Sequence, residues 1–153
     1  MRTVEAWVET PLKAFVTESQ ARVALLMTSS GQVVAQHGFT RSLDVMTAAS
    51  LGAGIIASTR ELAKETRAGS FGAVVHQGSR LGVYLMPFEM PASHWIGLVV
   101  FGPDTSLGMV QLFFGRMIDD LVRSAPRDAP TREILPETFE DDLNASLRAL
   151  FGR

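Results

Sequence analysis

The chain has 153 residues, of which 46% are hydrophobic, and its formal net charge is −2. The length and the hydrophobic fraction predict one domain with a sizeable core, followed by a tail. The sequence has no basic patch, which argues against a nucleic-acid partner. It contains no cysteine, which excludes disulfides and thiolate metal sites and fits a cytoplasmic protein. The chain shows neither a signal-peptide stretch at its start nor an apolar run long enough to span a bilayer, so we expect no membrane partner.

The first elements in chain order are a helix and a hairpin. Residues 8–20 predict the helix, in which Pro11 is tolerated because it falls in the first turn. The segment 22–28 is apolar on both faces and predicts a strand, and a turn leads from it to a second strand at 33–38. Two adjacent strands joined by a short turn predict a β-hairpin.

A long helix is predicted for residues 41–66, because their types favour helix despite two glycines. Leu51, Ile55 and Leu62 fall on one face and are spaced for contact with a sheet. A second face carries small residues where an ordinary surface helix carries charged ones; it consists of Ser50, Ala53, Gly54 and Ala57. Small residues let another backbone come close, so this face either meets a second chain or packs tightly within one chain.

Two further segments predict the rest of a sheet. Residues 72–87 predict a second hairpin, which turns through a two-residue loop at Gly78 and Ser79. Glycine in the first loop position suits a type II′ turn. Residues 95–101 are apolar without alternation, which predicts a central strand covered on both faces.

The stretch 99–112 has the layout of a phosphate-binding site, since a strand, a glycine loop and a helix follow one another. However, five residues separate Gly102 from Gly108, and Met109 stands where the Walker pattern requires lysine. We therefore interpret the loop as the cap of a core helix over 104–124. A side-chain oxygen that accepts the free N–H groups of the first turn is available at three positions, Asp104, Thr105 and Ser106.

The order of helix, two strands, helix, three strands and helix predicts the fold. Helices on both faces of a five-stranded antiparallel sheet give a three-layer α/β (α+β) sandwich, here over residues 1–124. A linker with three prolines follows at 125–137, and an amphipathic helix with an acidic first turn is predicted at 138–153. That helix must bury an apolar stripe, either on its own domain or in a groove of a partner; the stripe is Leu143, Leu147, Leu150 and Phe151.

The sequence offers no clear catalytic apparatus. No G-x-S-x-G motif is present, and without cysteine there is no thiol nucleophile. No second metal ligand lies at i+3 or i+4 from any of the histidines, which are His37, His76 and His94. We therefore predict no catalytic residue, no metal site and no cofactor, and an interaction protein rather than an enzyme.

Four stretches in this order resemble the roadblock / dynein light chain family, and within it the MglB-like proteins. They are VALLMTSSGQVVA (23–35), ASLGAGIIASTRELAKE (49–65), FGAVVHQGSRLGVYL (71–85) and VVFGPDTSLGMVQL (99–112). The likeness covers roughly residues 8–124, and the linker with its acidic terminal helix matches MglB-like proteins in kind. No single motif is specific; the ordered set carries the resemblance.

The resemblance implies a homodimer. MglB-like proteins pair through the second helix and the strand after it, and the two sheets join into one. Here that edge pairing would use about residues 72–77, in agreement with a small-residue helix face that meets a second chain. The implied interface residues are Ser50, Ala53, Ala73, Val74, Val75 and His76.

The resemblance also implies a partner, an MglA-like Ras-family GTPase in bacterial cell polarity or gliding motility. MglB-like dimers speed GTP hydrolysis without an arginine finger, because they hold the GTPase's own catalytic groups in place. Ala57 falls at a GTPase-contact position, with Gly54, Ser58 and Glu61 around it. Glu61 departs from the pattern, since small residues are usual there.

In such proteins the terminal helix can touch the GTPase away from the nucleotide and promote exchange. Leu143, Leu147, Leu150 and Phe151 would carry that contact here. Two other functions stay open. The chain could be a scaffold that docks a GTPase or signalling complex without altering turnover. It could also be a small-molecule sensor, because PAS- and profilin-like folds share the layer plan; that function needs a pocket between sheet and helix, against which the small-residue helix argues weakly.

Overall fold

The computed structural model describes residues 5–38 and 43–126. Its five strands form one sheet in the order β2-β1-β5-β4-β3, and every neighbouring pair is antiparallel. The elements are α1 (Ala6–Ser19), β1 (Val23–Thr28), β2 (Val33–Gly38), α2 (Val45–Thr66), β3 (Val74–Gln77), β4 (Gly82–Glu89), β5 (His94–Phe101) and α3 (Leu107–Ser124). The predicted element order and fold class are confirmed, whereas the predicted terminal helix and its apolar stripe lie outside the described residues.

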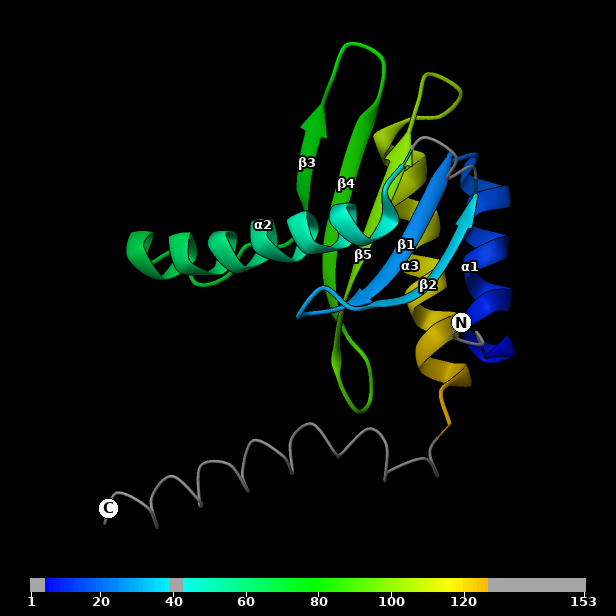
Figure 1. Cartoon of the computed structure of the whole chain (residues 1–153), viewed down its shortest axis with the longest axis horizontal. Coiled ribbons are helices and arrows are strands. Elements are labelled where there is room, and N and C mark those ends of the chain that lie inside the picture. Colours follow the sequence, from blue (N-terminus) through cyan, green and yellow to red (C-terminus); the bar gives the residue numbers. More distant parts are fainter. Residues whose placement is uncertain (1–4, 39–42, 127–153) are drawn as a thin grey trace.

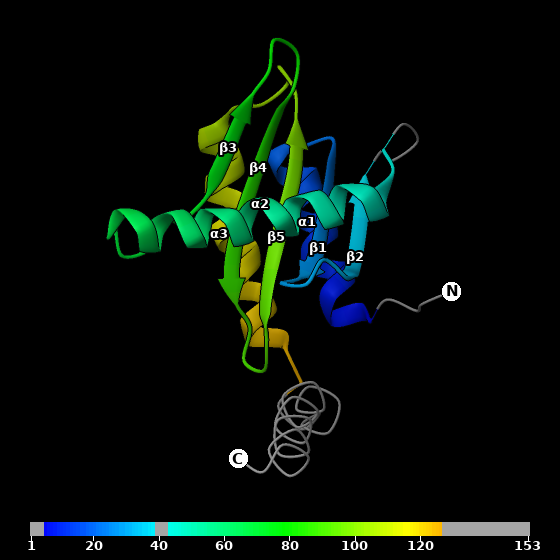
Figure 2. The same ribbon diagram turned by 60° about the vertical axis from the view of Figure 1, so that its left-hand side comes forward.

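Three layers build the domain. Helices α1 and α3 lie side by side on one face of the sheet, and α2 crosses the opposite face (Figures 1 and 2). The strand β5 is central, as predicted, and its side chains alternate between the two cores: Trp95 and Val99 pack with α1 and α3, while Ile96 and Leu98 pack with α2. Both faces of β5 are therefore buried, which explains its unbroken apolar run.

The face of α2 that meets the sheet is not the one predicted. Leu51 and Leu62 are 63% and 56% exposed, whereas the buried residues are small ones and one isoleucine, namely Ala49, Gly52, Ala53, Ile56 and Ala63. The helix lies so close to the sheet that a Cβ added at Gly52 would come 3.2 Å from Leu85 and 3.3 Å from Leu98. Of the predicted small-residue face, only Ala53 is buried, whereas Ser50, Gly54 and Ala57 are exposed. The face that packs on the sheet therefore lies between the two predicted faces.

Two helix starts are set by capping side chains. The Asp44 carboxylate accepts a hydrogen bond from the Thr47 N–H at 3.1 Å and begins α2. Of the three candidate caps for α3, Ser106 is the one used, because its hydroxyl accepts from the Met109 N–H at 3.2 Å. The stretch that resembles a phosphate loop is therefore an ordinary helix cap.

The turn between β3 and β4 differs from the prediction. Gln77 pairs with Gly82, and the Gly78 N–H donates to the Leu81 carbonyl oxygen at 2.8 Å. The strand pairing therefore extends to Gly78, and the two-residue loop is formed by Ser79 and Arg80. The predicted type II′ turn with Gly78 in its first position is wrong, because the φ of Gly78 is not positive.

Within the described residues, no helix has the length and apolar character needed to cross a membrane.

Candidate protein-binding surface

An apolar stripe runs along the outer side of α2. Leu51 and Leu62 are exposed and Ile55 is half-buried, and the stripe borders a shallow groove of about 470 Å³. The described residues that line this groove are apolar or small and uncharged, namely Ser50, Leu51, Gly54, Ile55, Ser58, Thr59 and Leu62. We call the stripe of Leu51, Ile55 and Leu62 the apolar flank. Exposed apolar patches are typical of surfaces that contact another protein, a membrane or a ligand.

The residues predicted to contact a GTPase lie next to the apolar flank. Gly54, Ala57 and Glu61 recur at helical spacing and all are exposed, so they form one surface, which we call the small-residue flank. A Cβ added at Gly54 would meet no atom within 4 Å. Ser58 is also exposed and lines the groove. Glu61 pairs with Lys64 at 3.1 Å, but both side chains are exposed, so this pair contributes little to stability.

The residues predicted for a dimer interface fall into two groups. Val74, Val75 and His76 belong to β3, and Ala73 directly precedes it. The sheet order places β3 at an edge, where its only partner among the described strands is β4. An unpaired edge is a template for pairing with another chain. In both views the C-terminal half of α2 projects past this edge (Figures 1 and 2).

The two predicted interface residues on α2 differ in exposure. Ser50 is exposed, but Ala53 is only 8% exposed because it packs against the chain's own sheet. Ala53 therefore has little surface to offer a second chain. The apolar flank, which the sequence had assigned to the sheet, has that surface instead.

A pocket that sequence reasoning missed lies between the C-terminal half of α2 and the adjoining ends of β4 and β5. Its volume is about 490 Å³. It is walled by α2, by the loop before β3, and by the adjoining ends of β4 and β5, through Ile56, Thr59, Arg60, Ala63, Lys64, Gly69, Ser70, Phe71, Gly72, Pro87, Phe88, Glu89 and His94. No local sequence pattern could have predicted this pocket, because its three walls are far apart in the sequence. The pocket between sheet and helix, against which the small-residue helix had argued, is present.

The histidines do not converge on one site. His37 lies on β2, His76 on β3 and His94 on β5, where its Nδ1 is 3.8 Å from an Oε1 of Glu89. Over residues 5–38 and 43–126, no group of three His, Cys, Asp or Glu side chains could hold a metal ion. The outer surface of α2, the β3 edge and the adjacent pocket are thus the distinctive features of the described chain, and all suit contact with another molecule.

Comparisons with known proteins agree with this architecture. MglB from Myxococcus xanthus is 26% identical, with a TM-score of 0.70 over 77% of this chain and 94% of that one. The gliding protein MglB from Thermus thermophilus is 31% identical, with a TM-score of 0.68 over 80% of this chain and 93% of that one. A Roadblock/LC7 domain from Streptomyces avermitilis shares the fold at 16% identity, with a TM-score of 0.63 over 78% of this chain and 95% of that one.

A comparison with curated proteins returned no match. The Roadblock/LC7 domain family, in contrast, matches residues 8–90, more than half of the sequence. This match and the likeness to the Thermus protein identify the chain as a member of the Roadblock/LC7 family.

Proposed function

We propose that this chain is a homodimeric regulator of an MglA-like Ras-family GTPase and accelerates GTP hydrolysis. The likeness to two MglB proteins over nearly their whole length carries the proposal. The exposed outer surface of α2 supports it, because that helix presents to solvent the residues assigned to GTPase contact. The protein has a regulatory role and supplies no catalytic residue of its own.

The small-residue flank is the proposed GTPase contact. Gly54 and Ala57 have little or no side chain, so a loop of the GTPase can lie close to the α2 backbone. Such a contact accelerates hydrolysis by fixing the GTPase's own catalytic groups and the attacking water in line with the phosphate. No arginine finger is needed, since positioning and electrostatic stabilisation supply most of the rate in phosphoryl transfer.

The proposed homodimer uses the β3 edge and the apolar flank. Pairing of β3 with its copy would satisfy the free N–H and C=O groups of that edge and extend the sheet across two protomers. The projecting half of α2 would then lie over the second protomer. Leu51, Ile55 and Leu62 of the apolar flank would lose their exposure to water between the two protomers, which favours association.

The C-terminal part of the chain has a separate proposed role. We take 1–124 as the roadblock domain, 125–137 as a linker and 138–153 as a helix that contacts the GTPase and promotes nucleotide exchange. Leu143, Leu147, Leu150 and Phe151 would form that contact. A full-length Leu147→Asp variant should alter nucleotide exchange and leave the dimer intact; unchanged exchange would remove this part of the proposal. A role in cell polarity or motility follows from the GTPase partner.

The decisive experiment measures GTP hydrolysis by the Ras-like GTPase encoded nearest to this gene, with and without an excess of the purified chain. Acceleration supports the proposed activity. Binding to the GTP-loaded GTPase without acceleration would instead support a scaffold that docks the GTPase and leaves its turnover unchanged. The absence of binding would refute both functions.

A further inference from the structure

The pocket beneath α2 combines an apolar floor with a charged rim. Its floor is formed by Ile56, Ala63 and Phe88, which are 2%, 3% and 8% exposed. Phe71, from the loop before β3, is 44% exposed and adds an aromatic wall. A cavity with such a floor takes up an apolar side chain, because water gains little by filling it.

One positive charge in this pocket, that of Arg60, has no acidic partner among the described residues. Lys64 pairs with Glu61 at 3.1 Å, and His94 lies 3.8 Å from Glu89. The Arg60 side chain makes no ion pair or hydrogen bond with another described residue. Within residues 5–38 and 43–126, the guanidinium donors of this pocket residue are therefore unpaired. A planar guanidinium is well suited to bind a carboxylate through two parallel hydrogen bonds.

The pocket also adjoins the small-residue flank. Arg60 follows Ala57 by one turn of α2 and directly precedes Glu61. A protein seated over Ala57 can therefore reach the pocket mouth with a neighbouring side chain. We propose that the pocket anchors the GTPase by taking up an element in which a carboxylate stands beside an apolar or aromatic side chain. This inference rests on the proposed function and specifies what the GTPase must present.

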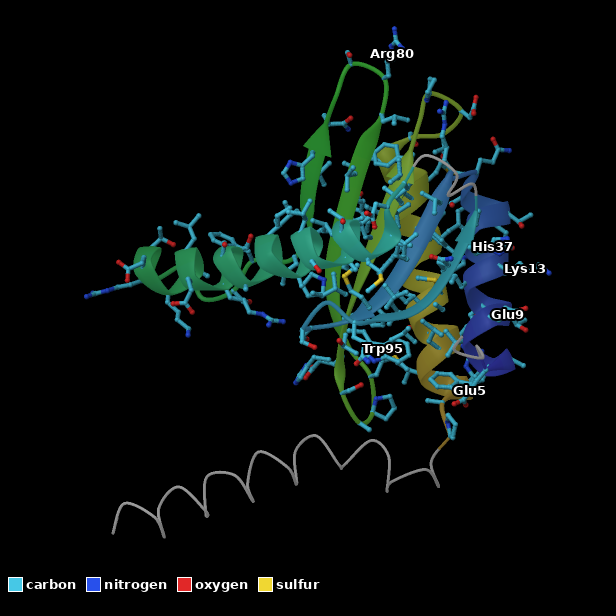
Figure 3. The ribbon with its side chains drawn as sticks, viewed as in Figure 1. Glu5, Glu9, Lys13, His37, Arg80 and Trp95 are labelled. Atoms are coloured by element: carbon cyan, nitrogen blue, oxygen red, sulfur yellow. The ribbon has the colours of Figure 1, made fainter. Side chains whose placement is uncertain are left out.

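The test compares two full-length variants with the same charge change. Arg60→Glu reverses the charge at the pocket. Arg80→Glu is the matched control, because Arg80 is also exposed and unpaired among the described residues but lies at the tip of the β3–β4 turn, at the opposite end of the sheet from the pocket (Figure 3). Calorimetry would measure the affinity of each for the MglA-like GTPase loaded with a non-hydrolysable GTP analogue.

We expect Arg60→Glu to weaken binding roughly tenfold or more, since two like charges replace an attractive pair. Arg80→Glu should change affinity less than about twofold, and Arg60→Lys should retain part of the affinity. Phe71→Ala should also weaken binding, because it removes the aromatic wall while leaving the charge in place.

Four results would overturn the inference. Equal losses in both charge reversals would indicate general attraction between the two proteins. Unchanged affinity in Arg60→Glu would show that the pocket is not used. Loss of the dimer in Arg60→Glu alone, seen by light scattering, would assign the pocket to the contact between protomers. Failure of the wild-type chain to bind the GTPase would refute the proposed function and this inference with it, whereas wild-type binding with an unaffected variant would refute the inference alone.

Discussion

The ring of Phe114 in α3 lies directly against the backbone of Gly97 in β5, so that no space remains for a Cβ at position 97. The same ring meets Phe15, Tyr84 and Phe88 edge-on, at centroid distances of 5.7, 5.4 and 5.8 Å. Phe114 is thus the centre of the core between the sheet and the α1/α3 layer. The missing side chain at Gly97 lets α3 approach the central strand closely enough for this packing.

Gly97→Ala should therefore destabilise the protein. The added methyl group must displace a ring that other rings hold in place, and overpacking of this kind costs about 1–3 kcal/mol. Urea unfolding would measure the change. Gly115→Ala is the control, since an added Cβ there meets no atom within 4 Å, and alanine in a helix should stabilise by up to about 1 kcal/mol. Equal stability of Gly97→Ala and wild type would contradict the described packing.

Leu62→Glu should convert the proposed dimer to a monomer. A charge placed on the apolar flank would have to be buried without a partner in the contact between protomers, and that cost opposes association. Light scattering after size exclusion would measure the mass. Leu112→Glu on α3 is a matched control, because Leu112 is 51% exposed compared with 56% for Leu62. A dimeric Leu62→Glu variant would place the dimer contact elsewhere.

Ala57→Arg should abolish the acceleration of GTP hydrolysis while the dimer remains. A long charged side chain would hold the GTPase away from the α2 backbone, and we expect affinity to fall about tenfold or more. Ala14→Arg places the same side chain at an exposed position of α1, on the other face of the sheet, and should leave hydrolysis unchanged. If the two variants behave alike, Ala57 lies outside the contact.

The cap of α2 predicts a pH dependence of stability. Hydrogen bonds from Thr47 hold the pKa of Asp44 below its ordinary value of 3.8. The Asp44 carboxylate therefore binds a proton more readily in the unfolded chain than in the folded chain. The ionised Asp44 carboxylate therefore adds to the free energy of unfolding above pH 3.8, and this contribution is lost as the pH falls through the lower pKa of the folded state.

Asp44→Asn removes this titration and keeps a side-chain oxygen at the cap. The difference in free energy of unfolding between wild type and this variant should be constant from pH 7 to about pH 5. Below pH 3.8 the wild type should lose stability relative to Asp44→Asn. Asp104→Asn is the control for the loss of a carboxylate in general. Asp104 is exposed and has no hydrogen-bond partner among the described residues. A parallel pH profile for the two aspartate variants would contradict the assigned role of Asp44.

Local patterns in the sequence determined which segments become helices and strands. The unbroken apolar run of β5 predicted a central strand, because only a strand buried on both faces dispenses with polar alternation. A side-chain oxygen before the helical period of α3 predicted its cap, and Ser106 provides it. These features depend on neighbours a few residues away, so they can be read without knowledge of the rest of the chain.

The tertiary structure alone decided which way α2 faces. Leu51 and Leu62 have the spacing of a core stripe, but the side chains of Leu85 and Leu98 rise from the sheet where α2 crosses it. A helix lined by Gly52 and Ala53 fits closely over those leucines, so the larger residues Leu51 and Leu62 turn outward and form an exposed apolar surface. The pocket beside Arg60 likewise exists only because α2, the loop before β3 and the end of β5 meet in space. Close packing between distant segments is a property of the folded shape, and no local periodicity records it.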